Sequence, residues 1–201
     1  MEQVRSFVAV ELPEGLKEEL LTLNERLKSG GHRGVRWIDP RGIHLTLKFL
    51  GDVDVDRLDD ITSAIKEAAS GFSPFSLKVS GLGVFPNPRR VRVAWVGISG
   101  EIDKLQQLHQ RVESSLAGIG FPAESRQFTP HLTLARVRDQ VSPDERQSFG
   151  YSIESTDFKA RHNIMVDTVF LMRSQLTRQG AIYSRLSSVG LGKDEPVKRY
   201  P

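Results

Sequence analysis

The chain has 201 residues, 38% of them hydrophobic and 26% charged, a composition typical of a globular protein that can bury one substantial core. Its 28 lysines and arginines outnumber 25 acidic residues, and this net charge of +3 tolerates a phosphate-bearing partner without requiring one. The absence of cysteine excludes disulfides, thiolate nucleophiles and cysteine-based zinc sites. The apolar run at 7–10 is too short for a signal-peptide core and no segment approaches a membrane span, so we expect a cytoplasmic protein with no membrane partner.

Strand and helix patterns alternate along the first half of the chain. Apolar or alternating stretches predict strands, and apolar residues spaced for one helical face, such as Leu16, Leu20 and Leu23, predict helices. In chain order we expect a strand at 4–11, a helix at 14–28, a strand at 43–50, a helix at 55–69 and a strand at 75–84.

The second half shows the same order of patterns. We expect a strand at 91–98, a helix at 101–117, a strand at 131–137, a short helix near 143–149, a strand at 158–172 and a last strand at about 181–189. The proline- and arginine-containing stretch at 86–90 is interpreted as a tight crossover between the halves. Strands interleaved with helices of this length predict an α/β or α+β domain of two similar lobes with no linker between them.

The chain contains an internal repeat. A shift of 87 residues places the tetrad His-Leu-Thr-Leu at 44–47 on an identical tetrad at 131–134, and the patterns on either side keep that register. We interpret this as a duplicated unit, with copies at about 4–85 and 91–172, inside a single domain that spans 1–201.

Each tetrad places an imidazole beside a hydroxyl on one face of a strand. Side chains alternate along a strand, so His44 shares a face with Thr46, and His131 shares one with Thr133. If a pseudo-two-fold axis relates the lobes, the two polar faces meet across one cleft. Histidine has an ordinary pKa of about 6.5 and can act as acid or base near neutral pH, and hydroxyls can donate to phosphate oxygens. A single such histidine is usually structural, but the repetition indicates acid–base attack on a phosphodiester, with His44 and His131 as the candidate catalytic residues.

Two cations follow the tetrads and could bind a phosphate. Arg136 is favoured over Lys48, because a guanidinium matches phosphate geometry bidentately. On a regular strand, however, Arg136 faces away from His131, so a bulge is needed to direct it inward. Lys48 is otherwise interpreted as an exposed strand residue.

Three aromatic residues, Phe49, Phe85 and Trp37, could stack a nucleic-acid base. Such residues are more often part of the core, which we expect for Phe49 and Trp37. The remaining histidines, His32, His109 and His162, have no comparable context and are expected to be structural or solvated.

Several other chemistries lack their residues in this sequence. Two histidines without carboxylates or cysteines at ligand spacing make a poor zinc site, so no metal is expected. The Gly-x-Ser-x-Gly elbow of serine hydrolases and the phosphate-binding loop of nucleotide triphosphatases do not occur.

The two His-x-Thr-x motifs resemble those of the 2H phosphoesterase superfamily. Four flanking segments are similar to its RNA 2′,3′-cyclic phosphodiesterase branch, also described as 2′-5′ RNA ligase-like: 5–10, 48–51, 83–86 and 176–183. Pro130 and the dipeptide at 135–136 are similar as well, and the similarity extends to about residue 189.

This resemblance implies an α+β bilobal fold with a sheet in each lobe, helices outside and a central active-site cleft. It implies metal-independent hydrolysis of an RNA-terminal 2′,3′-cyclic phosphate to a 2′-phosphate, with His44 as proton donor to the leaving 3′ oxygen and His131 as base for water. Some members of the branch also join RNA ends through a 2′-5′ bond. We expect RNA with that terminus, tRNA fragments included, as the partner of a monomer that needs no cofactor.

Two alternatives remain open from the sequence. One is an esterase for small cyclic nucleotides or ADP-ribose cyclic phosphate, and the other is a non-catalytic RNA or nucleotide binder that keeps the cleft. Comparing an oligonucleotide with a mononucleotide of the same cyclic end separates the first, and absence of turnover identifies the second.

Overall fold

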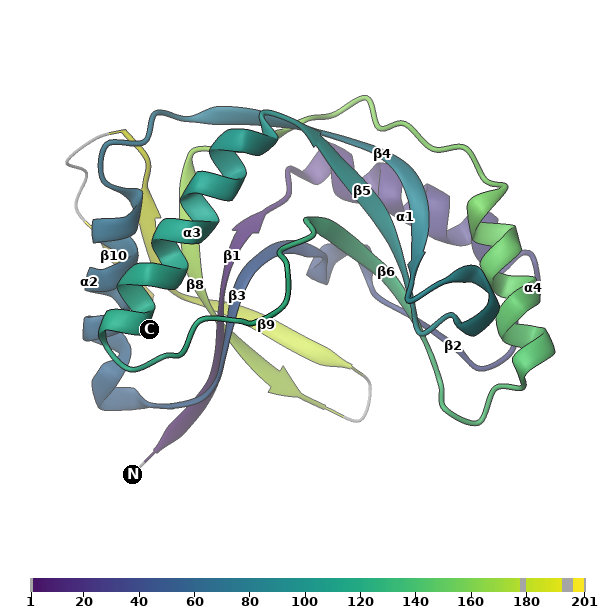
Figure 1. Ribbon diagram of the computed structural model, residues 1–201, viewed down its shortest axis with the longest axis horizontal. Coiled ribbons are helices and arrows are strands. Elements are labelled where there is room, and N and C mark those ends of the chain that lie inside the picture. Colours follow the sequence, from purple (N-terminus) through teal and green to yellow (C-terminus); the bar gives the residue numbers. More distant parts are fainter. Residues whose placement is uncertain (1, 178–179, 193–196, 201) are drawn as a thin grey trace.

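The computed structural model describes residues 2–177, 180–192 and 197–200 and contains two five-stranded sheets flanked by helices (Figure 1). The strand orders are β10-β9-β8-β1-β3 in the first sheet and β2-β6-β5-β4-β7 in the second. The two-lobed α+β architecture expected from the sequence is confirmed. Arg178 and Gln179, which belong to the similar segment at 176–183, lie outside the described residues, as does part of the tail.

The first sheet carries helices α2 and α3 on its outer face. Its strands are β1 (Gln3–Glu11), β3 (His44–Asp54), β8 (Thr168–Leu176), β9 (Ala181–Gly190) and β10 (Lys198–Arg199). Helices α2 (Leu58–Ala69) and α3 (Ile102–Gly118) lie next to each other in Figure 1, and a short turn, η2 (Val55–Arg57), leads into α2. The hydroxyls of Thr62 on α2 and Ser187 on β9 are 2.8 Å apart, which fixes this helix to the sheet.

The second sheet lies against helices α1 and α4. Its strands are β2 (Val35–Trp37), β4 (Phe75–Phe85), β5 (Val93–Gly100), β6 (His131–Val137) and β7 (Ile164–Val166). Helix α1 (Glu14–Lys28) is tied to this lobe by Arg26, which donates to the carbonyl of Asp157, two residues before a bridge from Lys159 to β4. Helix α4 (Pro143–Glu154) packs on the turn η3 (Pro88–Arg90) between β4 and β5.

The two halves of the sequence exchange strands between the sheets. Strand β4 comes from the first half but pairs with β5 in the second sheet, whereas β8 and β9 come from the second half but extend the first sheet from β1. The sequence repeats therefore do not coincide with the lobes. One continuous hydrophobic core joins all four long helices and both sheets, so the lobes form one packed body.

Three expected elements differ from the structure. The helix expected near 143–149 continues to Glu154 and includes Gly150, while Ser142 and Glu145 form a complete capping box at its start. The expected strand at 158–172 is instead two strands, β7 and β8, which lie in different sheets. The stretch at 86–90 is not a crossover between lobes, because it connects β4 to its immediate neighbour β5. Other boundaries shift by a few residues, most of all the end of β3 at Asp54.

The register of the repeat slips by one residue in the first strand of each copy. Glu11 pairs with His44, and Gly97 pairs with His131, so the structural offset between β1 and β5 is 86 residues while that between the tetrads is 87. The unbroken register expected from the sequence is therefore wrong for these strands. The sequence comparison did not reveal this shift, because offsets of 86 and 87 residues both align apolar residues of β1 with apolar residues of β5 at most positions.

Candidate active site

A cavity of about 1180 Å³ lies between the two sheets, and both tetrads face it. Strand β3 contributes His44 and Thr46, and β6 contributes His131 and Thr133. The leucines between them, such as Leu45 and Leu132, are fully buried on the opposite faces of the strands. Strand alternation thus brings two imidazoles and two hydroxyls to one cleft.

Backbone carbonyls fix the tautomer of both imidazoles. Nδ1 of His44 lies 2.8 Å from the carbonyl oxygen of Gly42, and Nδ1 of His131 lies 2.7 Å from that of Thr129. A carbonyl oxygen only accepts hydrogen bonds, so each Nδ1 carries a proton and donates it. Nε2 is then the nitrogen of each ring that can accept or release a proton.

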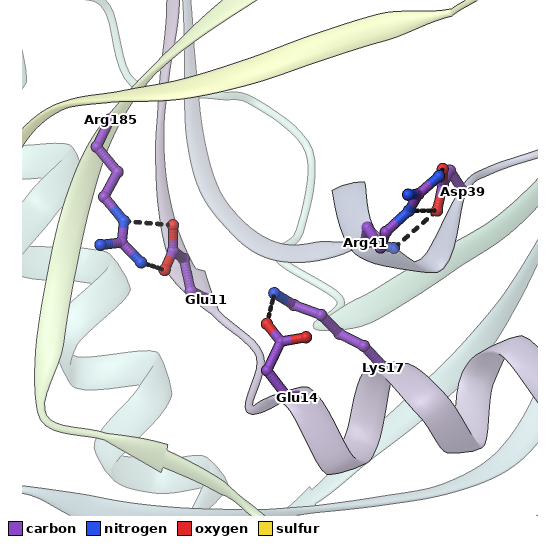
Figure 2. Close-up of polar contacts among 6 residues, drawn as sticks. All are labelled: Glu11, Glu14, Lys17, Asp39, Arg41 and Arg185. Atoms are coloured by element: carbon purple, nitrogen blue, oxygen red, sulfur yellow. Dashed lines mark hydrogen bonds and ion pairs between the residues drawn. The ribbon is translucent and has the colours of Figure 1, made fainter.

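The carbonyl that holds His44 is positioned by a capped turn. Gly42 ends the short turn η1 (Pro40–Gly42), and the carboxylate of Asp39 accepts from the backbone N–H of Arg41 at 3.0 Å. The same carboxylate pairs with the Arg41 guanidinium, as Figure 2 shows. This pairing keeps the pKa of Asp39 below its ordinary value, so the cap stays charged.

Aromatic side chains pack against both imidazoles. His44 stacks on Phe7 with ring centroids 4.5 Å apart, and the edge of Tyr183 meets it at 4.8 Å. His131 is met edge-on by Phe85 at 5.0 Å. These contacts limit rotation of the rings and remove water from them.

Burial lowers the pKa of both imidazoles, but the nearby charges differ. Loss of solvent is the largest cause for His44 and for His131, and the carbonyl hydrogen bonds oppose it. The carboxylate of Glu11 additionally raises the pKa of His44, whereas the guanidinium of Arg136 lowers that of His131. Of the nearby charges, Glu11 therefore favours the charged form of His44 and Arg136 the neutral form of His131.

Glu11 is itself held by an arginine from a distant strand. Glu11 on β1 is the pairing partner of His44, and Arg185 reaches it from β9, donating from Nε at 2.9 Å and from Nη2 to the two carboxylate oxygens (Figure 2). On the way the guanidinium lies 5.0 Å above the ring of Phe170 on the intervening strand β8. The pair fixes the carboxylate beside His44. Figure 2 also shows a smaller pair, Glu14–Lys17 on α1, which lies outside the cavity lining.

A bulge follows each tetrad and turns a further side chain into the cavity. The pairing of β5 with β6 shifts between Ala94 and Trp95, and that of β1 with β3 shifts between Val8 and Ala9. Beyond each bulge the alternation reverses, so Arg136 is exposed on the same face as His131, as a phosphate-binding role requires. Phe49 is the equivalent residue after His44, and 61% of it is exposed. The expectation that Phe49 belongs to the core is therefore wrong, whereas Trp37 packs against the core as expected.

Lys48 is not an exposed strand residue. Its side chain is only 2% exposed, and its Nζ donates to Glu113 at 2.8 Å and to the carbonyl of Pro122 at 2.9 Å. The bulge turns Lys48 toward the core side of β3, where it needs a buried partner. It anchors α3 and the loop at 119–130. Of the two cations that follow the tetrads, Arg136 is therefore the one available to a ligand in the cleft.

Several cleft residues were not identified as site residues from the sequence, among them Tyr183, Phe128 and His109. Tyr183 and Phe128 line the cavity, and so does His109, which stacks on Phe128 at 3.9 Å. His109 is thus half-buried beside Glu113 rather than solvated. Tyr183 alone had a signal, because alternation along the last strand places it on the face shared with Arg185.

Basic side chains predominate around the cavity. Seven of its lining residues are basic and two are acidic: Arg5, Lys48, Arg90, Arg92, Arg126, Arg136 and Arg146 against Glu124 and Asp139. Lys48 is neutralised by Glu113, and Arg146 is engaged by backbone carbonyls such as that of Val91. The remaining arginines give a positive cleft that suits a phosphate ester.

The part of the chain that the structure describes lacks both a metal-binding cluster and a membrane-spanning helix. Within it no group of three or more histidine, aspartate or glutamate residues is arranged to hold a metal ion. Nor does any helix there have the length and apolar character needed to cross a membrane.

Comparison with known proteins agrees with the fold. The family model described as LigT like Phosphoesterase matches the chain twice, at residues 10–95 and 96–183. The chain therefore belongs to the LigT-like phosphoesterase family of the 2H superfamily. The double match agrees with the internal repeat.

Relatives of known name are similar over almost their whole length. An RNA 2′,3′-cyclic phosphodiesterase of Methanothermobacter thermautotrophicus is 35% identical over 182 residues, 90% of this chain and 96% of the relative. One from Aquifex aeolicus is 30% identical over 197 residues, 96% of this chain and 100% of the relative.

Solved structures share the fold. That of TT0787 from Thermus thermophilus has a TM-score of 0.77 and 26% identity, and covers 95% of this chain and 100% of its own. Escherichia coli LigT complexed with 3′-AMP has a TM-score of 0.74 over 96% of this chain and 100% of its own, but at 23% identity it supports the fold alone.

Proposed function

We propose that this protein hydrolyses a 2′,3′-cyclic phosphate at the end of an RNA to a 2′-phosphate, with two imidazoles as acid and base and no metal ion. The observation that carries the proposal is the pair of Nε2 atoms presented to one cavity by carbonyl-locked rings. The names of its relatives supply the substrate class. Because one chain provides both imidazoles, the site needs no residue from a second copy, and the proposal is for a protein active as a monomer.

The geometry supports an in-line displacement at phosphorus. Nε2 of His131 takes a proton from water as the water oxygen bonds to phosphorus, and the bond from phosphorus to the 3′ oxygen breaks. Nε2–H of His44 gives its proton to that leaving oxygen, so the products are a 2′-phosphomonoester and a 3′-hydroxyl. Glu11 beside His44 and Arg136 beside His131 support these roles, since they favour a charged acid and a neutral base.

Other cleft residues bind the substrate in this proposal. The hydroxyls of Thr46 and Thr133 donate to non-bridging phosphate oxygens, and Arg136 binds the same phosphate through its guanidinium. Phe49 is exposed in the cleft and Phe85 lies against His131, so both offer faces on which a base can stack.

The test is incubation with an RNA that ends in a 2′,3′-cyclic phosphate, followed by separation of 2′- from 3′-phosphate products. The wild-type protein is expected to release only the 2′-phosphate. His44→Ala and His131→Ala should each lower kcat by about 10² to 10⁴-fold. His162→Ala, which removes an imidazole bound to Glu19 outside the cavity lining, is the matched control and should keep its kcat. A 3′-phosphate product, or turnover that survives both cleft substitutions, contradicts the proposal.

The same arrangement supports a second reaction, the joining of two RNA ends, in which another nucleophile opens the cyclic phosphate. If the 5′-hydroxyl of a second RNA takes the place of water, His131 accepts its proton and a 2′-5′ phosphodiester forms. Adding an RNA with a free 5′-hydroxyl in excess should yield a joined product that is resistant to nucleases specific for 3′-5′ bonds. Failure to join under these conditions removes ligation from the proposal and leaves hydrolysis standing.

A further inference from the structure

Basic side chains on η3 and just after it extend from the active-site cavity to a second, shallow pocket on the surface. Arg90 and Arg92 line the cavity, and Arg90 also lines a shallow pocket of about 430 Å³ together with Asn87, Pro88, Arg89 and Tyr151. Arg90 is thus shared by the two. The turn begins only a few residues after Phe85, whose ring contacts His131, so the surface starts beside the catalytic imidazole.

The arginines of this surface are available to bind phosphate. Arg89, Arg90 and Arg92 are all exposed. Among the residues the structure describes, no carboxylate lies within ion-pair distance of their guanidinium groups, whereas Arg185 and Lys48 are both paired. Adjacent unpaired guanidinium groups repel one another, so a polyanion stabilises this arrangement.

Tyr151 adds an aromatic ring at the far end. It is 51% exposed, a large value for a tyrosine on a helix whose buried face is formed by Phe149, Gly150 and Ile153. An exposed ring beside unpaired arginines is the combination with which proteins bind single-stranded nucleic acid, because bases stack on the ring and phosphates contact the cations.

The surface is rigid because η3 is anchored from two directions. The side chain of Asn87 accepts from the backbone N–H groups of Arg89 and Arg90, each at 3.1 Å. Helix α4 approaches so closely that a Cβ atom at Gly150 would lie 2.2 Å from the carbonyl oxygen of Pro88. Figure 1 shows this turn against α4 in the second lobe.

We infer that the RNA strand leading to the cyclic end leaves the cavity over Arg92 and Arg90 and crosses η3, with a phosphate on Arg89 and a base stacked on Tyr151. This inference rests on the proposed function and extends it, because it makes a polynucleotide rather than a mononucleotide the preferred substrate. The track formed by Arg92, Arg90, Arg89 and Tyr151 contributes binding and takes no part in the proton transfers.

The experiment compares a short oligoribonucleotide ending in a 2′,3′-cyclic phosphate with 2′,3′-cyclic CMP. Tyr151→Ala should raise KM for the oligonucleotide about fivefold or more, which is the effect expected from the loss of one base–aromatic stack. Arg89→Gln should raise it as well and reduce the slope of log(kcat/KM) against log salt by about 0.7, the value of one phosphate contact on a single strand. Neither residue lines the catalytic cavity, so both variants should hydrolyse 2′,3′-cyclic CMP as the wild type does.

Two controls separate recognition from folding. Tyr151→Phe keeps the ring and should retain the wild-type KM for the oligonucleotide. Lys66→Gln removes one exposed positive charge from α2, outside the cavity lining, and should leave both KM and the salt slope unchanged.

The outcomes distinguish the inference from the proposed function. If the wild type hydrolyses both substrates and the Arg89 and Tyr151 variants lose nothing on the oligonucleotide, the track is disproved and the proposed function stands. An equal loss on both substrates also overturns the track. If the wild type hydrolyses neither substrate, the proposed function fails and the track fails with it.

Discussion

The imidazoles of His44 and His131 are alike in their hydrogen bonding and differ in the charge that faces them. Each donates Nδ1–H to the carbonyl two residues earlier, and each has a pKa lowered chiefly by burial. The carboxylate of Glu11 acts on one ring and the guanidinium of Arg136 on the other. This difference breaks the equivalence of the two tetrads and favours His44 as the acid and His131 as the base.

The pH dependence of kcat/KM should show this difference. The proposed mechanism requires neutral His131 and protonated His44, so a bell-shaped profile is expected, with its maximum on the acidic side of the ordinary histidine pKa of about 6.5. Arg136 lowers the pKa of His131, so Arg136→Gln should raise that pKa and move the acidic limb to higher pH. The profile is measured with 2′,3′-cyclic CMP across the acidic and neutral range.

Glu11→Gln provides the opposite case. The Glu11 carboxylate raises the pKa of His44, so its removal should lower that pKa and move the alkaline limb to lower pH. If both substitutions move the same limb, His44 is not the acid or His131 is not the base.

At the scale of single residues, the sequence predicted that the two histidines and two threonines of the tetrads meet in one cleft, and little of their surroundings. Duplication made the histidines and threonines recognisable, because the same pair recurs in both halves. His109 reaches the cleft only through packing of α3 against a loop distant in the sequence, which local spacing does not encode. Alternation along the last strand gives the face on which Tyr183 lies, but not that this face meets His44. The directions of the Lys48 and Phe49 side chains depend on a β-bulge in β3, and no glycine or other turn residue in the sequence marks its position.

At the scale of elements, the contact between α4 and η3 controls where Arg89 and Arg90 lie. Replacing Gly150 by alanine would favour the helix intrinsically by about 1 kcal/mol, but the added Cβ would overlap backbone atoms of Pro88 that cannot move aside freely. Overpacking of this kind typically costs about 1–3 kcal/mol.

Gly150→Ala is therefore expected to lower the free energy of unfolding, as measured by urea denaturation. Gly118→Ala on α3 is the matched control, since nothing lies within 4 Å of its Cβ position. The control should be as stable as the wild type or slightly more so. Equal stabilities of the two variants would show that the η3 contact can relax.

The buried pair Lys48–Glu113 connects β3 to α3 and to the loop at 119–130. Lys48→Met leaves the Glu113 carboxylate buried without its cation, and such unpaired charges typically cost about 3–5 kcal/mol. Replacing both, as in the double variant Lys48→Met with Glu113→Leu, should recover most of the loss. Thermal and urea unfolding of the three proteins form the test, and a single variant as stable as the wild type would exclude the pair as an anchor.

Element positions were predictable because apolar periodicity is strong in this chain. Helices α1, α2 and α3 and most of the longer strands were expected within a few residues of their observed bounds, whereas the short strands β2 and β10 were not expected. Errors arose at α4, where an internal glycine and a polar surface obscured the second half of the helix, and at 158–172, where the chain passes from one sheet to the other at Asp167. A local pattern contains no information on which sheet a strand joins.

At the scale of the whole molecule, the two lobes together supply every group that the proposed reaction needs. Acid, base, hydroxyls and guanidinium all come from side chains of the chain itself, so activity should be unchanged after dialysis against EDTA. Hydrolysis of the cyclic-ended RNA is followed with and without chelator, and then with added magnesium or zinc. A loss on chelation that one metal restores would refute the metal-independent mechanism.

The exchange of strands between the sheets has a consequence for whether half of the chain can fold alone. A single copy of the repeat, on its own, would leave β1 and β3 without β8 and would project β4 with no neighbouring strand. Unpaired strand edges of this kind favour pairing with another chain. A separately produced half is therefore expected to associate with a second copy, or with the missing half, by exchanging closing strands as in domain swapping.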